Sequence, residues 1–320
     1  MNVYVRNVLI SVAITLSIGF GLFLYSPTQL LLWQNLLIAT FILGYTHFVI
    51  GFIYQTRSVF RKDNVRLKTA FILFFILSGA FALYLLHLNL ITLLAILAVP
   101  YFMVHELFNE QTLTQQQTGK TYTWLLFVAG VTWFTALLFL AIPHNSFFYN
   151  NDLSYMSVAN GFFVEYLQMF MPLWTFTTLP LFMLLVSVPA LIYVVIRMNY
   201  WRIGIPVLLV VGASTIISLF FEPIAYVYLF SFILSYHFIM WMLHFGIRFY
   251  AHSRREFATY VGVHVVIMAP LILAVVLEGN ASRWVYATFL NSATFVILTY
   301  IHITLSFLNE TWVQRFFKIV

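Results

Sequence analysis

Cysteine is missing from this chain of 320 residues, and charge is scarce. Without cysteine there is no disulfide, no thiolate metal site and no thiol nucleophile, so a bound metal would have to be held by histidine and carboxylate side chains. Charged residues make up only 8% of the chain and hydrophobic residues 63%, against about 25% charged residues in an ordinary soluble domain. Such a composition cannot cover a water-facing globule. No phosphate-binding glycine motif or nucleophile-elbow motif occurs, so nucleotide binding and serine hydrolysis have no support.

Long apolar stretches recur along the chain, each long enough to cross a hydrocarbon core of about 30 Å. We therefore predict an all-α fold: a polytopic transmembrane helix bundle of about ten spans, forming a single integral membrane domain over residues 1–320. No cleavage signal follows the first stretch, which favours a spanning helix over a removed signal peptide. The predicted spans are roughly 7–25, 30–54, 67–88, 90–108, 122–142, 161–196, 203–221, 224–249, 258–278 and 284–308.

The distribution of lysine and arginine predicts the orientation of these spans, because cytoplasmic loops carry an excess of both. With a cytoplasmic N-terminus, only Arg283 of the 15 cations lies on the outer side. The inner cations are Arg6, Arg57, Arg61, Lys62, Arg66, Lys68, Lys120, Arg197, Arg202, Arg248, Arg254, Arg255, Arg315 and Lys318. We expect both termini to be cytoplasmic and the membrane to be the prokaryotic cytoplasmic membrane. The membrane topology therefore accounts for the excess of basic residues, which does not indicate a nucleic-acid partner.

Six of the nine histidines fall at one membrane depth in this topology, in the inner halves of five spans. They are His47, His105, His237, His244, His302 and His264. Ionisable residues at membrane depth are costly and usually face a bundle interior, where they serve a ligand, an ion path or a proton relay. Imidazole is also the commonest protein ligand for zinc, copper and iron. The cluster indicates a metal site, and histidines scattered over helix ends are the alternative.

Local spacing refines this interpretation. His237 and His244 are seven residues apart, which places them on nearly one helix face but about 10 Å apart along the axis. They cannot both bind one ion without distortion of the helix. His47 is flanked by Gly44 and Gly51 on the same face, and small residues there let a neighbouring helix or a flat ligand come close.

Two inner helix ends combine histidine with carboxylate and amide groups, and such groups near an imidazole can ligate a metal or orient a ligand histidine. The predicted metal ligands are His47, His105, His237, His244 and His302. The side chains predicted to orient or replace them are Glu106, Asn109, His264, Asn309 and Glu310. Solvated helix-end acids are the alternative for Glu310, and no catalytic residue is assigned.

These features resemble the Brp/Blh family of membrane β-carotene 15,15′-dioxygenases, which make retinal. The resemblance rests on the absence of cysteine, aromatic-rich helices, single histidines on early spans and a later histidine pair, which is seven residues apart here and four apart in the family. The segment Tyr45-Thr46-His47-Phe48-Val49-Ile50-Gly51 stands where the family has Pro-His-Gly. The resemblance implies iron held by His47, His105 and His237 with His244 or His302.

The residues alone favour a broader function. The 35 Phe, 19 Tyr and 8 Trp suit a cavity for an apolar substrate, beside which a histidine-held metal activates dioxygen. The hypothesis is a non-haem oxygenase in the lipid bilayer, with iron (Fe2+) or another transition metal, acting on a lipid or isoprenoid such as a carotenoid. A proton-coupled transporter with a histidine relay is one alternative. A b-haem electron-transfer protein, with His47 and His237 as axial ligands, is the other.

Overall fold

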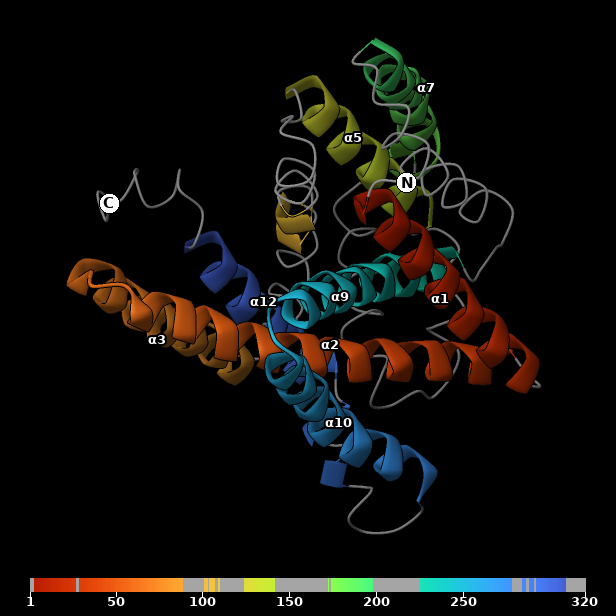
Figure 1. The fold of residues 1–320 in the computed structure, drawn as a ribbon. Helices are drawn as coiled ribbons and strands as arrows, with labels where there is room; N and C mark the ends of the chain where they lie inside the picture. The colour runs from red at the N-terminus through yellow and green to blue at the C-terminus, as the bar shows by residue number, and fades with distance from the viewer. Residues whose placement is uncertain are drawn as a thin grey trace. The chain divides into compact units, whose positions relative to one another are not determined.

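The computed structural model describes residues 3–26, 29–88, 101–102, 104–106, 109, 124–141, 172, 174–197, 225–277, 284–285, 288–290 and 292–308. Within these residues every regular element is a helix and no strand occurs, which confirms the predicted all-α class (Figure 1). The helices are α1 (Val3–Tyr25), α2 (Gln29–Arg61), α3 (Val65–His87), α5 (Trp124–Ala141), α7 (Trp174–Arg197), α9 (Ala225–His252), α10 (Arg254–Val276) and α12 (Ser292–Leu308).

Six segments of the described helices are long and apolar enough to cross a membrane, as expected of an integral membrane protein. They are Arg6–Tyr25, Ile38–Arg61, Val65–His87, Thr177–Val194, Phe232–His252 and Arg254–Val276. α5 and α12 contain shorter apolar helices. α5 lies within the fifth predicted span (122–142), whereas α12 covers only residues 292–308 of the tenth (284–308). The seventh predicted span (203–221) and most of the fourth (90–108) lie outside the described residues.

Two of the helix breaks are set by side chains that cap the next helix. Asn64 lies between α2 and α3 in an extended conformation, and its side chain accepts a hydrogen bond from the Leu67 backbone N–H at 3.0 Å. Ser253 separates α9 from α10 in the same way and accepts from the N–H of Arg255 and Glu256. Both residues satisfy backbone donors that the first turn of a helix leaves unpaired.

α2 is longer than the sequence predicted. It has 33 residues and runs on to Arg61, where the predicted span ended at residue 54. At 1.5 Å per residue it is about 50 Å long, which exceeds a hydrocarbon core of about 30 Å. The basic cluster that begins at Arg57 therefore ends the apolar part of this helix but not the helix itself.

The chain forms two compact units, which are described separately. The first unit holds Met1–Thr40 and Glu106–Arg248, and the second holds Phe41–His105 and Phe249–Val320. In the first unit α5 packs against α7. A polar face of α1 lies towards α9, because the Ser11 hydroxyl reaches Met240 Sδ at 3.6 Å. Ser11 and Thr15 also donate to the carbonyl oxygens four residues earlier, which satisfies their hydroxyls within the helix.

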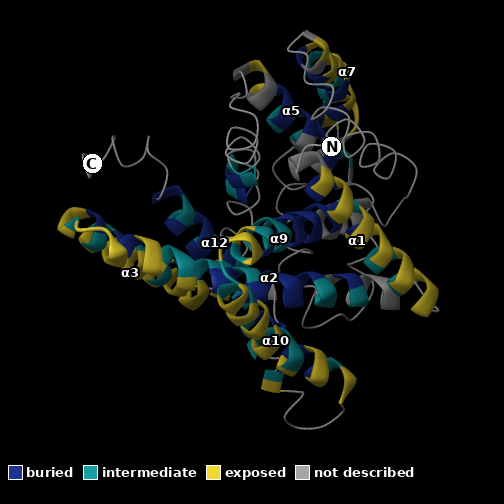
Figure 2. Cartoon of the chain, in the orientation of Figure 1, coloured by how far each residue is buried: buried dark blue, intermediate teal, exposed yellow. Residues whose placement is uncertain are grey.

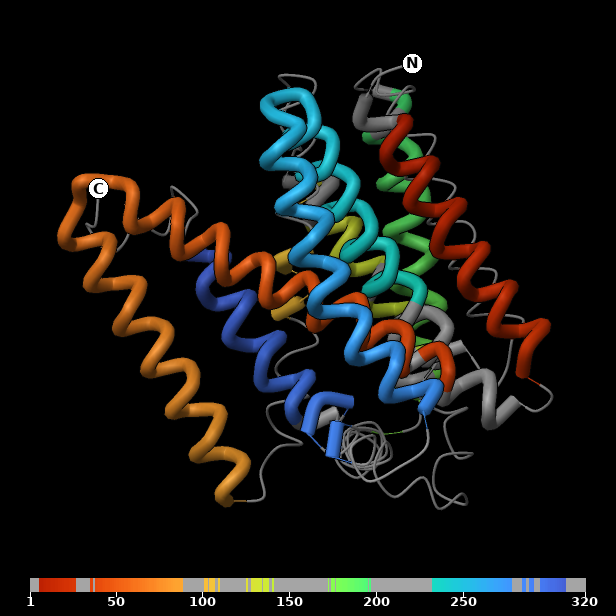
Figure 3. Tube along the Cα trace, turned by 60° about the horizontal axis from the view of Figure 1, so that its bottom comes forward, coloured from red at the N-terminus to blue at the C-terminus, as the bar shows by residue number. Residues whose placement is uncertain are grey.

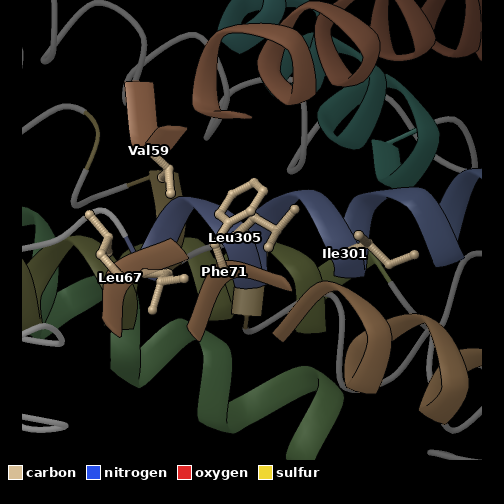
Figure 4. Close-up of a cluster of buried hydrophobic side chains, with 6 residues drawn as sticks. Val59, Leu67, Phe71, Ile301 and Leu305 are labelled. Atoms are coloured by element: carbon tan, nitrogen blue, oxygen red, sulfur yellow. The ribbon is translucent and has the colours of Figure 1, made fainter. Parts of the chain in front are cut away.

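In the second unit α12 packs along α3 (Figure 3). Most of the α3 surface that does not face α12 is exposed (Figure 2). α2, α3 and α12 share a buried apolar cluster (Figure 4). Its members are Val59, Leu67, Phe71, Ile301, Leu305 and Leu308. α2 and α12 run parallel, because Phe41 stacks on Phe295 while Gln55, further along, bonds Ser306. In the predicted topology, the second and tenth spans also cross the membrane in the same direction.

Candidate histidine site

Two histidines from distant parts of the sequence meet between α2 and α12. His47 Nε2 lies 3.1 Å from His302 Nε2, and the two ring centroids are 4.7 Å apart with the planes at 70°. His302 is buried and His47 is half-buried. This contact brings together two of the predicted metal ligands from positions 255 residues apart in the chain.

Gly51 allows this contact. A Cβ atom at position 51 would lie 2.7 Å from His302 Cε1 and 2.9 Å from His302 Nδ1, closer than side chains tolerate. The imidazole of His302 therefore rests directly on the backbone of α2, one turn beyond His47. The small residue predicted beside His47 does admit a close neighbour, and that neighbour is a ring of the protein's own α12.

His105 joins the pair from a third segment. It is buried, and its ring centroid lies 5.7 Å from that of His302 with the planes at 85°. Phe48, Phe52 and Phe307 pack against these imidazoles, with centroids 5.3 to 6.0 Å away. Three histidines from three segments of the second unit thus lie together in aromatic surroundings.

The separation of the two Nε2 atoms is chemically informative. A distance of 3.1 Å is that of a hydrogen bond between a protonated and an unprotonated nitrogen. It also suits two ligands of one ion, since metal–nitrogen bonds of about 2.0–2.1 Å at right or tetrahedral angles separate the nitrogens by about 2.8–3.4 Å. Among the described residues, no three histidine or acidic side chains are placed to hold one metal ion together.

Glu106 and His237 form a second group, within the first unit. Glu106 Oε2 pairs with His237 Nδ1, and the two side chains are 14% and 2% exposed. A carboxylate beside an imidazole nitrogen can fix the orientation of the ring. Glu106, one of the side chains predicted to orient a ligand histidine, thus lies against His237.

His244 lies on the same helix as His237, with Trp241 against both rings at centroid distances of 5.6 Å and 6.5 Å. The indole of Trp241 thus contacts both imidazoles along α9. His264 lies elsewhere, against the Tyr260 ring on α10, and its Nδ1 is 2.8 Å from the Tyr260 carbonyl oxygen.

Three further predicted residues are Asn109, Asn309 and Glu310. Asn109 is described as half-buried and helical. Asn309 and Glu310 lie outside the described residues. Gln55 and Ser306, in contrast, were missed: Gln55 Nε2 donates to Ser306 Oγ at 2.7 Å. Their spacing was a usable signal, because Gln55 is two turns from His47 and Ser306 one turn from His302.

A scan against protein-family models matched none, and neither a search of curated proteins nor one of solved structures returned a match.

Gly51→Ala is expected to lower the free energy of unfolding by about 1–3 kcal/mol, because the added methyl forces the His302 ring off α2. Thermal unfolding in detergent measures the change. Gly79→Ala on α3 is the matched control, since a Cβ there meets only Ile301 Cδ1, at 4.0 Å. Equal stability of the two variants would show that the ring does not rest on Gly51.

Glu106→Leu and His237→Leu are each expected to destabilise the fold by about 3 kcal/mol, because each leaves a buried polar partner behind. The double variant should lose much less than the sum. Chemical unfolding of the four proteins gives the coupling energy, and additive losses would contradict the pairing. Glu106→Gln, which keeps an acceptor oxygen, should retain part of the stability.

Proposed function

We propose that this protein is an integral membrane enzyme that binds a transition metal ion through Nε2 of His47 and His302 and oxidises an apolar lipid or isoprenoid. The observation that carries the proposal is the 3.1 Å separation of the two Nε2 atoms. His105, whose ring faces His302, supplies the nearest further imidazole. Carotenoids are the substrate class that the Brp/Blh resemblance suggests.

The donor set fits iron or a similar transition metal. Imidazole nitrogen is a common ligand for such ions, and the two Nε2 atoms are spaced as adjacent ligands of one ion would be. When bound, the metal would supply the binding and activation of dioxygen. Gly51 supports the arrangement, because it lets α12 bring His302 against α2.

The surrounding side chains suit a reaction on an apolar molecule. Phe48 is 2% exposed, and together with Phe52 and Phe307 it encloses the imidazoles in aromatic rings. These rings exclude bulk water on their side of the histidines and offer flat apolar surfaces to a polyene or an acyl chain. The aromatic rings are therefore proposed to orient the substrate, and the histidines to hold the metal.

A proton relay is the second candidate function, because the same 3.1 Å contact is of hydrogen-bond length. A transporter would use it to pass a proton from one imidazole to the other. A b-haem electron-transfer protein, with His47 and His237 as axial ligands, remains the other alternative.

We further propose that both termini are cytoplasmic, in a prokaryotic cytoplasmic membrane. The support is the basic cluster at the end of α2 and start of α3, where Arg57, Arg61, Lys62 and Arg66 are exposed. Such clusters favour the cytoplasmic side. The opposite end of α3, at His87 and Leu88, carries no lysine or arginine.

The metal proposal is tested by metal analysis of detergent-purified protein after anaerobic loading with Fe2+. We expect bound iron in the wild type and its loss in His47→Ala and His302→Ala, because each removes one of the two Nε2 ligands. His252→Ala, at an exposed histidine at the end of α9, should retain the metal. Size-exclusion profiles and thermal unfolding establish that each variant is folded.

A folded wild type without bound metal would overturn the metal proposal. Proton uptake by reconstituted vesicles, abolished by His47→Ala, would then establish the relay instead. A Soret band in the purified protein would identify haem.

The orientation is tested by single cysteines at the two ends of α3, which is possible because the chain has no cysteine of its own. We expect a membrane-impermeant maleimide added to intact cells to label Leu88→Cys and not Lys62→Cys. Permeabilised cells should label both, and the reverse pattern on intact cells would show that the orientation is wrong.

A further inference from the structure

Three aromatic rings join the last turns of α2 to the end of α9 and the start of α10. Tyr54 of α2 stacks on Phe249 of α9, with the ring centroids 5.0 Å apart and the planes at 28°. Tyr260 of α10 contacts both rings, at centroid distances of 6.2 Å and 5.2 Å. All three residues belong to the second unit, so the contact places the end of α2 beside the turn between α9 and α10.

Arginine residues flank this aromatic contact. Arg57 and Arg61 follow Tyr54 by three and seven residues, which places them on the same face of α2, the face that meets α9 and α10. Arg254 and Arg255 are the first two residues of α10. All four arginines are exposed. Two pairs of cations from distant parts of the sequence therefore lie at the same end of the second unit.

Positive charge exceeds negative charge at this end. Residues 57–68 hold five lysine or arginine residues and one acid, Asp63, and the first turn of α10 adds two arginines and Glu256. Glu256 Oε2 lies 3.9 Å from His252 Nε2, whereas the four flanking arginines form no ion pair with another described side chain. Their charge is therefore available to an anion from outside the protein.

The exposed stripe of α2 that leads to Arg57 is apolar. Val49 and Ile53 lie two turns and one turn before Arg57, and they are 36% and 47% exposed. Both belong to the apolar segment Ile38–Arg61, so their exposed surface suits acyl chains. Over about 12 Å the stripe thus changes from apolar to cationic, in the same order as a phospholipid changes from acyl chain to headgroup.

We propose that the end of α2 and the turn between α9 and α10 bind the headgroup of an anionic phospholipid. Arg57 and Arg61 on one side and Arg254 and Arg255 on the other hold the phosphate, because a guanidinium offers several N–H donors to phosphate oxygens. The acyl chains lie along the apolar stripe, which a free phosphate ion would leave unused. The inference does not depend on whether the histidine pair binds a metal or passes protons.

Native mass spectrometry of the full chain in detergent tests the site, with phosphatidylglycerol and phosphatidylcholine of identical acyl chains as probes. We expect the wild type to retain phosphatidylglycerol in preference. Arg57→Gln combined with Arg61→Gln should lower the affinity for this lipid at least about tenfold, because each cation beside an anionic lipid adds attraction. Arg254→Gln combined with Arg255→Gln should act in the same way, and binding of phosphatidylcholine should not change.

The matched control is Arg66→Gln combined with Lys68→Gln, which removes two charges from the start of α3, outside the three-ring contact. An equal loss of phosphatidylglycerol in this control would overturn the inference, because overall charge would then explain the binding. Equal retention of both lipids by the wild type would overturn it too. Displacement of phosphatidylglycerol by sodium phosphate at equal concentration would contradict a lipid as the occupant. Size-exclusion profiles and thermal unfolding establish that each double variant is folded.

Discussion

The polar contacts between α2 and α12 in the second unit depend on one contact, in which the imidazole of His302 lies on the backbone of Gly51. A Cβ at that position would overlap the ring, so the approach of α12 to α2 exists only because glycine stands there. Once the ring is seated, its Nε2 reaches His47, and the next turn of each helix brings Gln55 to Ser306. The opposite side of α12 is then left for the apolar cluster with α3.

A membrane interior makes every unpaired polar group expensive, and the protein meets this constraint in two ways. Isolated hydroxyls, such as those of Thr46 and Thr299, donate to the carbonyl oxygen four residues earlier and so need no partner from another helix. Histidine side chains use both ways. His264 Nδ1 lies 2.8 Å from the Tyr260 carbonyl oxygen four residues earlier, whereas His302 meets His47 and His237 meets Glu106 over long sequence distances.

The sequence was informative about elements and much less so about partners. Apolar runs predicted where the described helices lie because length and hydropathy are local properties. The spacing of His47 and Gly51 correctly indicated a close neighbour. That the neighbour is His302 depends on how helices far apart in the chain pack, which no local pattern encodes. Gln55 was not predicted as a site residue because a single glutamine near a helix end resembles a solvated residue. α2 was predicted too short because charged residues end an apolar span without ending the helix.

The contact between His47 and His302 depends on the tautomer of each ring. For both Nε2 atoms to ligate one ion, each must present a lone pair, so the proton of each neutral ring must sit on Nδ1. Nδ1 of His302 lies over Gly51. With Nε2 protonated instead, the same 3.1 Å contact becomes a hydrogen bond to His47. The tautomer of His302 therefore distinguishes the two chemistries proposed for the pair.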